Sequence, residues 1–253
     1  MEYIALFLFG LVMGSFYNVL IYRLPRSISV IVPSSHCPSC RKPIKWYDNI
    51  PLLSFVILKG KCRNCKTKIP IQYPFVELVS GLIAVYSYLR WGATSDALVY
   101  YMFFSALLVL SFIDLKFFII PDIITLPGIA LGLLFSFFRK TIDPVQSITG
   151  LALGFGISFF IYLFYIKVRK IEGLGFGDVK LLAMIGSVTG VYGVLSALFL
   201  GSLLGLIFAL PSVVKNRNIQ FAIPFGPFLS LGCFLGILLE DYLFNSASFF
   251  STR

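Results

Sequence analysis

The sequence predicts an all-α polytopic membrane protein with about eight transmembrane helices and a small cytoplasmic zinc-knuckle insert. Apolar residues make up 58% of the 253-residue chain and charged residues only 13%, which is too little polar surface for a soluble domain of this length. Long apolar runs recur along the chain, and one polar segment near the N-terminus differs from all of them. These three observations fix the predicted class.

The apolar runs are each long enough to cross a bilayer or come close to it. The longest, 181–214, contains 34 residues without a charge, so we expect two short spans that are hinged near Gly190–Gly193. With that division the count is eight, from the runs 3–22, 73–89, 97–113, 123–138, 145–166, 181–214 and 225–239.

Glycines four residues apart recur within these runs. In membrane helices this spacing is typical of close helix packing, with self-association as a less general use. The pairs are Gly10/Gly14, Gly150/Gly154, Gly186/Gly190, Gly201/Gly205 and Gly232/Gly236.

The distribution of positive charge predicts the orientation. Arg23 and Arg26 follow the first apolar run, which places the N-terminus outside and the next segment in the cytoplasm. If the segments between successive spans then alternate between the two sides of the membrane, 17 of the 21 Lys and Arg residues lie on the cytoplasmic side. The net charge of +10 is therefore explained by topology, and we expect no nucleic-acid partner.

The cytoplasmic insert spans residues 23–72 and contains ten Lys or Arg residues. Two Cys-x-x-Cys pairs, Cys37/Cys40 and Cys62/Cys65, are separated by 21 residues, which is close to the spacing of zinc ribbons. Two disulfides are the alternative, but the reducing cytoplasm disfavours them. We expect a structural zinc ion, because a segment of this size has little core without one.

Asp114 and Asp178 are the candidate catalytic residues. Asp114 is the first charge after 17 apolar residues, at the expected C-terminal end of a helix, where a carboxylate is unfavourable. A simple interfacial charge neutralised by Lys116 is the alternative. By contrast, Pro121 and Asp122 suit the first turn of the next helix.

Asp178 follows a run of alternating glycines in the sequence GLGFGDVK. Read alone, it is the N-cap of the next span in a flexible turn. The expected topology, however, places it on the same membrane face as Asp114. Two such carboxylates can share a proton and activate a water, which is the chemistry of an aspartic protease.

The motifs together resemble those of the bacterial type IV prepilin peptidases, which are membrane aspartic proteases of the GxGD class. The similarity covers nearly the whole chain and runs in order through GSFYNVLIYRLP (14–25), the two cysteine pairs, GKCR (60–63), YPFVEL (73–78), Asp114, IPD (120–122) and GFGDVK (175–180).

This resemblance implies three parts: a first transmembrane helix (1–22), the four-Cys insert (23–72) and a peptidase helical bundle (73–253) in the bacterial inner membrane. It implies that Asp114 and Asp178 cleave the basic leader of type IV prepilins or pseudopilins after a glycine at the cytoplasmic face. It further implies methylation of the new N-terminus with S-adenosylmethionine.

The methyl-donor site is the least defined. The sequence has no Rossmann-type fingerprint, and the candidates within the matching motifs are Asn18, Arg23 and Glu77. Asn18 is equally suited to an interhelical hydrogen bond, and Glu77 to pairing with a basic residue. Two alternatives stay open: a peptidase without methyltransferase activity, and a transporter that uses intramembrane acids.

Overall fold

The protein is all-α in the part of the chain that the computed structural model describes, residues 1–170, 174–216 and 223–250, where no β-strand occurs. This confirms the predicted fold class. The helices are α1 (Glu2–Arg23), α2 (Leu53–Ile57), α3 (Gln72–Trp91), α4 (Ser95–Phe117), α5 (Asp122–Phe135), α6 (Pro144–Phe164), α7 (Phe176–Asn216) and α8 (Gly226–Phe250).

Among the described residues, four helical stretches are long and apolar enough to cross a membrane: Glu2–Arg26, Ser95–Phe117, Pro144–Arg169 and Phe176–Leu210. Two shorter apolar helices, Asp122–Phe135 and Gly226–Glu240, accompany them. Within α7 the backbone is non-helical at Gly190, with φ 68° and ψ −164°, so the predicted hinge is present. The total of eight spans stays a prediction.

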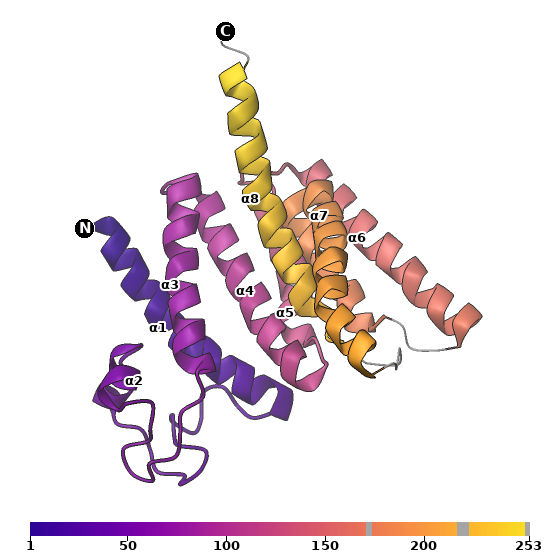
Figure 1. Ribbon diagram of the computed structural model, residues 1–253. Coiled ribbons are helices and arrows are strands. Elements are labelled where there is room, and N and C mark those ends of the chain that lie inside the picture. The colour runs from indigo at the N-terminus through magenta and orange to yellow at the C-terminus, as the bar shows by residue number, and fades with distance from the viewer. Residues whose placement is uncertain (171–173, 217–222, 251–253) are drawn as a thin grey trace. The chain divides into compact units, whose positions relative to one another are not determined.

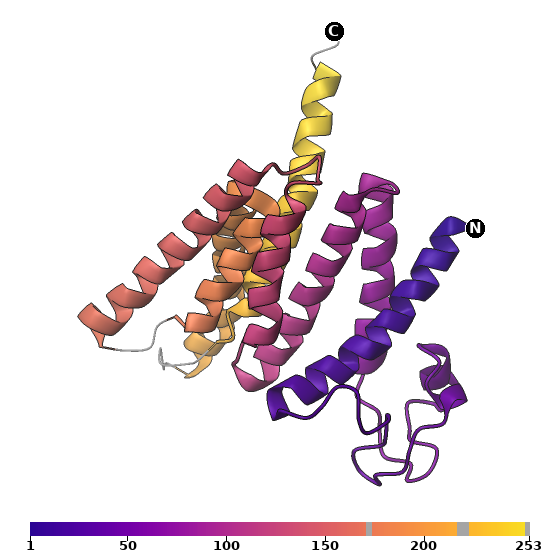
Figure 2. The same ribbon diagram turned by 180° about the vertical axis from the view of Figure 1, so that it is seen from behind.

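The chain forms two compact units, Met1–Val109 and Leu110–Arg253. In the first, α1 lies against α3, and the loops of the insert emerge where α1 ends and α3 begins (Figures 1 and 2). Gly10 and Gly14 allow the two helices to lie close together. A Cβ on either glycine would lie only 2.6 Å from the backbone of α3. The hydroxyl of Tyr17 on α1 donates a hydrogen bond of 3.3 Å to that of Tyr101 on α4.

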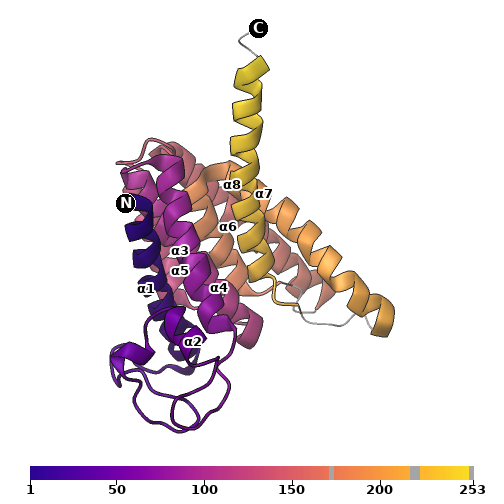
Figure 3. The same ribbon diagram turned by 60° about the vertical axis from the view of Figure 1, so that its left-hand side comes forward.

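In the second unit, α6, α7 and α8 lie side by side (Figures 1 and 3). Gly150 of α6 faces Gly186 of α7 so closely that neither position has room for a Cβ. Gly232 of α8 likewise meets the backbone of Gly201 on α7. The predicted use of the glycine pairs in helix packing is confirmed at these positions.

Candidate functional sites

Asp114 and Asp178 lie at the ends of two helices of the second unit. Asp114 is in the last turn of α4 and Asp178 in the first turn of α7, and their exposed fractions are only 5% and 8%. The two carboxyl groups are close enough to interact electrostatically. The structure therefore brings together the two acids that the sequence singled out.

The two carboxyl groups have different partners. The backbone N–H of Gly226, the first residue of α8, donates a hydrogen bond of 3.0 Å to Asp114 Oδ2. Asp178 Oδ1 is buried and has no hydrogen-bond partner among the residues that the structure describes. A buried, unsatisfied carboxylate oxygen is costly and is typical of a site that binds a further group. Asp178 lies within α7 and is therefore not its N-cap.

Ile120, in the short connection between α4 and α5, lies close to Gly177, which precedes Asp178, and to Gly226, which binds Asp114. A Cβ placed on Gly177, the neighbour of Asp178, would lie 2.9 Å from the Cβ of Ile120. A Cβ placed on Gly226 would lie 2.9 Å from Asp114 Oδ2 and 3.3 Å from Ile120 Cδ1. The two glycines thus allow Ile120 and the acids to approach one another.

An ion pair joins the helix starts on either side of this cluster. Lys180 Nζ of α7 contacts Asp122 Oδ1 of α5, and the same ammonium lies 5.1 Å from the centre of the Phe176 ring. Asp122 begins α5 after Pro121, as the sequence predicted. The pair ties the segment that contains Ile120 to the helix that contains Asp178.

The four cysteines of the insert form one cluster in the first unit. Their Sγ atoms all lie within 4.8 Å of one another, and those of Cys37 and Cys65 are 3.8 Å apart. A disulfide would require about 2.0 Å, whereas the edge of a tetrahedron with Zn–S bonds of about 2.3 Å is about 3.8 Å. The residues therefore fit a metal ion.

Both cysteine pairs fold into the same turn. The N–H of Cys37 donates to Lys42 O and the N–H of Cys62 donates to Thr67 O, at 3.0 and 2.9 Å. Each turn contains a residue in the left-handed region, Arg41 (φ 57°) and Lys66 (φ 60°). Each such turn directs its two thiols toward one point, as the clustering of the four Sγ atoms shows.

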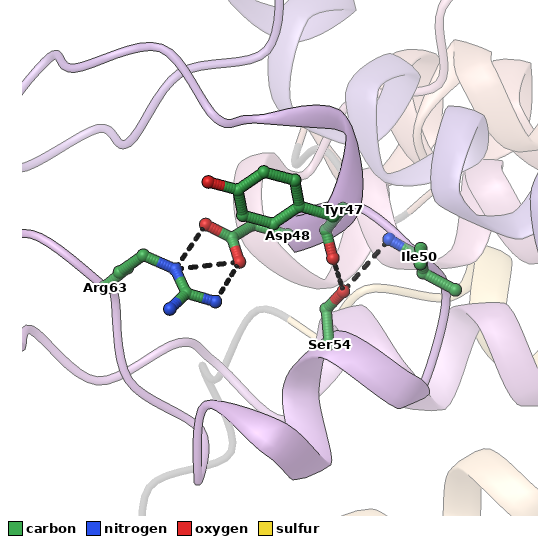
Figure 4. Close-up of polar contacts among 5 residues, drawn as sticks. All are labelled: Tyr47, Asp48, Ile50, Ser54 and Arg63. Atoms are coloured by element: carbon green, nitrogen blue, oxygen red, sulfur yellow. Dashed lines mark hydrogen bonds and ion pairs between the residues drawn. The ribbon is translucent and has the colours of Figure 1, made fainter.

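Hydrogen bonds and an ion pair connect several residues of the insert, as Figure 4 shows. Arg63, between the second pair of cysteines, forms a bidentate ion pair with Asp48, and its NH2 lies 2.6 Å from Oδ1. This guanidinium holds the pKa of the Asp48 carboxyl below its usual value. Ser54 Oγ donates to Tyr47 O and accepts from the N–H of Ile50, at 3.0 Å each.

Asn18, Arg23 and Glu77 line a single cavity of about 700 Å³ between α1, α3 and the insert. Asn18 Nδ2 donates to Tyr73 O on α3 (3.1 Å), so the interhelical alternative is also realised. Glu77 Oε2 accepts from the N–H of Leu52 in the insert (2.8 Å). The guanidinium of Arg23 donates to three carbonyl oxygens in the loop that follows α1, those of Ser29, Pro33 and Ser34.

The lining of this cavity suits a ligand with charged and aromatic parts. The carboxylate of Glu77 offers an acceptor to a cation, Lys42 and Lys45 offer positive charge, and aromatic rings complete the wall, those of Phe16, Tyr22, Phe55 and Tyr73. The volume falls within the usual range for small-molecule sites. S-adenosylmethionine, with its sulfonium, amino-acid and adenine groups, matches that set.

Two residues of the acid site were not predicted. Ile120 carries no chemical signal, and only the fold reveals that it touches both glycines. Gly226 was detectable in principle, because the sequence Gly226-Pro227 after a polar stretch is typical of a helix start. Nothing in the sequence, however, indicated that the first N–H of that helix would bind Asp114.

Comparison with known proteins supports the same picture. Residues 8–91 match the family model described as Bacterial Peptidase A24 N-terminal domain, and residues 101–210 match that of the Type IV leader peptidase family. A "Prepilin leader peptidase/N-methyltransferase" of Pseudomonas putida is 32% identical over 94% of this chain and 90% of its own length. The chain belongs to the type IV leader peptidase family.

Two further relatives extend this result. A Bacillus subtilis protein with the same name is 34% identical over 95% of both chains. The "Type 4 prepilin-like proteins leader peptide-processing enzyme" of Escherichia coli O78:H11 is 36% identical over 91% of both. No solved structure matches the chain. The resemblance inferred from the motifs is confirmed, and with the long apolar helices it indicates a multi-pass inner-membrane protein.

Proposed function

We propose that this chain is a membrane aspartic endopeptidase that cleaves the basic leader of type IV prepilins or pseudopilins after a glycine. The observation that carries the proposal is the pairing of Asp114 and Asp178, buried at adjoining helix ends in a member of the type IV leader peptidase family. We place the reaction at the cytoplasmic face, because the positive charges cluster at these helix ends.

The acids divide the chemical work between them. One carboxyl group is protonated and polarises the scissile carbonyl, while the other is ionised and takes a proton from the attacking water. Asp178 Oδ1, for which the described part of the chain provides no hydrogen-bond partner, would bind that water or the substrate. The N–H of Gly226 holds Asp114 in place. The two roles belong to the pair, and neither is assigned to one residue.

The second step is methylation of the new N-terminus, with S-adenosylmethionine as the methyl donor. The cavity lined by Asn18, Arg23 and Glu77 supports this, because it joins a carboxylate, cations and aromatic rings in one volume of about 700 Å³. Glu77 would receive the positively charged part of the ligand. Asn18 and Arg23 would hold the walls, through their bonds to α3 and to the loop after α1.

The four-cysteine cluster would hold a structural zinc ion. The match between the 3.8 Å Sγ–Sγ separation and a tetrahedral site supports zinc, and all four ligands come from the insert. By joining the two turns, the metal would stabilise the loops that form one wall of the cavity, which includes Cys37 and Cys62.

One experiment tests both activities. The purified full-length protein is incubated in detergent with a type IV prepilin and S-adenosylmethionine, and the product is analysed by mass spectrometry. We expect loss of the leader after its glycine and the added mass of one methyl group. Cleavage without the methyl group identifies a peptidase only, and an intact prepilin contradicts the proposed function.

A further inference from the structure

Ile120 occupies the space beside the acid pair. Its exposed fraction is only 9%, although it lies in a connection of only a few residues between α4 and α5. Its Cβ, Cγ1 and Cδ1 atoms lie 2.9, 3.3 and 3.5 Å from the position that a Cβ on Gly177 would take. One branched side chain therefore fills the volume next to the residue that precedes Asp178.

The same side chain also reaches the other acid. Ile120 Cδ1 and Asp114 Oδ2 both lie within 3.3 Å of the position that a Cβ on Gly226 would take. Ile120 thus borders Asp114 on one side and the Gly177–Asp178 turn on the other. We expect a group that contacts both carboxyl groups to approach this side chain.

The position of Ile120 is fixed from both sides. Phe118 has a left-handed backbone (φ 55°), which turns the chain sharply after α4, and Pro121 then precedes α5. The ion pair between Asp122 and Lys180 ties the start of α5 to α7. A side chain held in this way is suited to a steric role, because it cannot easily move aside.

We propose that Ile120 determines specificity for the residue on the leader side of the scissile bond. This inference rests on the proposed peptidase function. The scissile peptide must come within about 2.6–3.2 Å of the catalytic carboxyl groups, which brings its adjoining residue against Ile120. A residue without a Cβ fits beside this side chain, whereas a larger one collides with it.

The test compares two prepilins, one with glycine before the scissile bond and one with alanine at that position. The ratio of their kcat/KM values is measured for the full-length wild-type protein and for Ile120→Ala and Ile120→Val. A methyl group in a tight pocket changes such a ratio by about 10–200-fold. We expect Ile120→Ala to reduce the preference for glycine at least about tenfold, and Ile120→Val to reduce it less.

The neighbouring Ile119 provides the control. Its side chain is 45% exposed, and Ile119→Ala should leave the ratio unchanged. If Ile120→Ala changes kcat/KM by the same factor for both prepilins, the proposal is overturned, because Ile120 would then only support the fold or restrict access. If Ile120→Ala is inactive, the ratio for Ile120→Val decides, and an unchanged value rejects the inference.

The proposed function has a separate readout in the same experiment. If the wild-type protein leaves the glycine prepilin intact, the peptidase assignment fails before any variant is compared. If it cleaves that prepilin while the ratio is the same in all variants, only the role of Ile120 is rejected.

Discussion

Asp114 and Asp178 are both buried acids at helix ends, yet their surroundings differ. Asp114 is held by the first N–H of α8, whereas Asp178 has an oxygen that none of the residues in the described ranges binds. The two residues thus combine a fixed acid with one that is open to an incoming group. This asymmetry depends on Gly226, which lies 112 residues after Asp114 in the chain.

Asp114→Asn and Asp178→Asn should each abolish prepilin cleavage, because an amide can neither take a proton from water nor share one with the remaining acid. Cleavage is followed by the mobility shift of the prepilin on a gel, with variant expression measured in membranes. Asp143→Asn is the matched control: Asp143 caps α6, and asparagine caps equally well. Full cleavage by either variant of the pair would contradict the assignment.

Gly177→Ala should lower the cleavage rate, because its Cβ would lie 2.9 Å from that of Ile120. Overpacking of this kind costs about 1–3 kcal/mol, and relief of the strain would displace Asp178. The double variant Gly177→Ala/Ile120→Ala should recover part of the lost rate, as measured by kcat/KM with the glycine prepilin. No recovery would show that Gly177 is required for its backbone and not for contact with Ile120.

At the scale of the element, the break in α7 defines the helix that contains Asp178. Gly190 adopts φ and ψ values that are accessible almost only to glycine. Arg139 NH1 donates a hydrogen bond of 2.7 Å to Val188 O, just before the break, and so satisfies a carbonyl that the interrupted helix leaves open. The half-helix that begins at Phe176 therefore has a defined end.

Gly190→Ala should reduce the free energy of unfolding by about 1–3 kcal/mol, the usual cost of a residue forced into this region. Thermal unfolding of the purified protein in detergent measures the effect. Gly156→Ala on α6 is the control, because a Cβ there would meet nothing within 4 Å. Equal stability of the two variants would mean that α7 can become straight at residue 190 without a decrease in the free energy of unfolding.

The two cysteine turns form a second element, which we propose holds a metal ion. Alanine at Cys37 or Cys62 should remove the metal and reduce methylation more than cleavage, because the insert forms a wall of the cavity and the acids lie in the other unit. Zinc content is measured by inductively coupled plasma mass spectrometry, and prepilin cleavage and methylation are measured on the same samples.

Cys233→Ala is the control for this substitution. Cys233 is fully buried in α8 of the second unit and is not part of the four-cysteine cluster, so its replacement should leave the zinc content unchanged. An equal loss of methylation and cleavage in the Cys37 and Cys62 variants would show that the insert only supports the fold.

At the scale of the whole molecule, the two proposed activities occupy different units. The residues that line the cavity all lie before position 78, and both acids lie after position 109. The products of the first step are the substrates of the second, and this arrangement does not require one copy of the chain to perform both.

A mixture of the Asp114→Asn and Cys37→Ala variants should therefore produce cleaved and methylated pilin, although each variant alone should not. The product is detected by mass spectrometry after co-incubation with prepilin and S-adenosylmethionine. A mixture of Asp114→Asn with Asp178→Asn is the control and should leave the prepilin intact. Unmethylated product from the first mixture would indicate that both sites must work in the same copy.

The sequence predicted much of this architecture because membrane helices and metal turns are local features. Apolar runs predicted the helices, and the uncharged run 181–214 predicted the break that occurs at Gly190. The Cys-x-x-Cys spacing predicted the cluster, because each turn needs only a few residues. Asn18, Arg23 and Glu77 were chosen from motifs, and the fold places all three on one cavity.

Local sequence determined the class of the protein, its helices, its cysteine turns and the two acids, since hydropathy, charge and turn geometry depend on neighbouring residues. Tertiary structure alone decided which groups surround those acids. Ile120 and Gly226 reach Asp114 and the Gly177–Asp178 turn only because glycines let α4, α7 and α8 approach closely, and such contacts between distant segments leave no periodic or compositional trace in the chain.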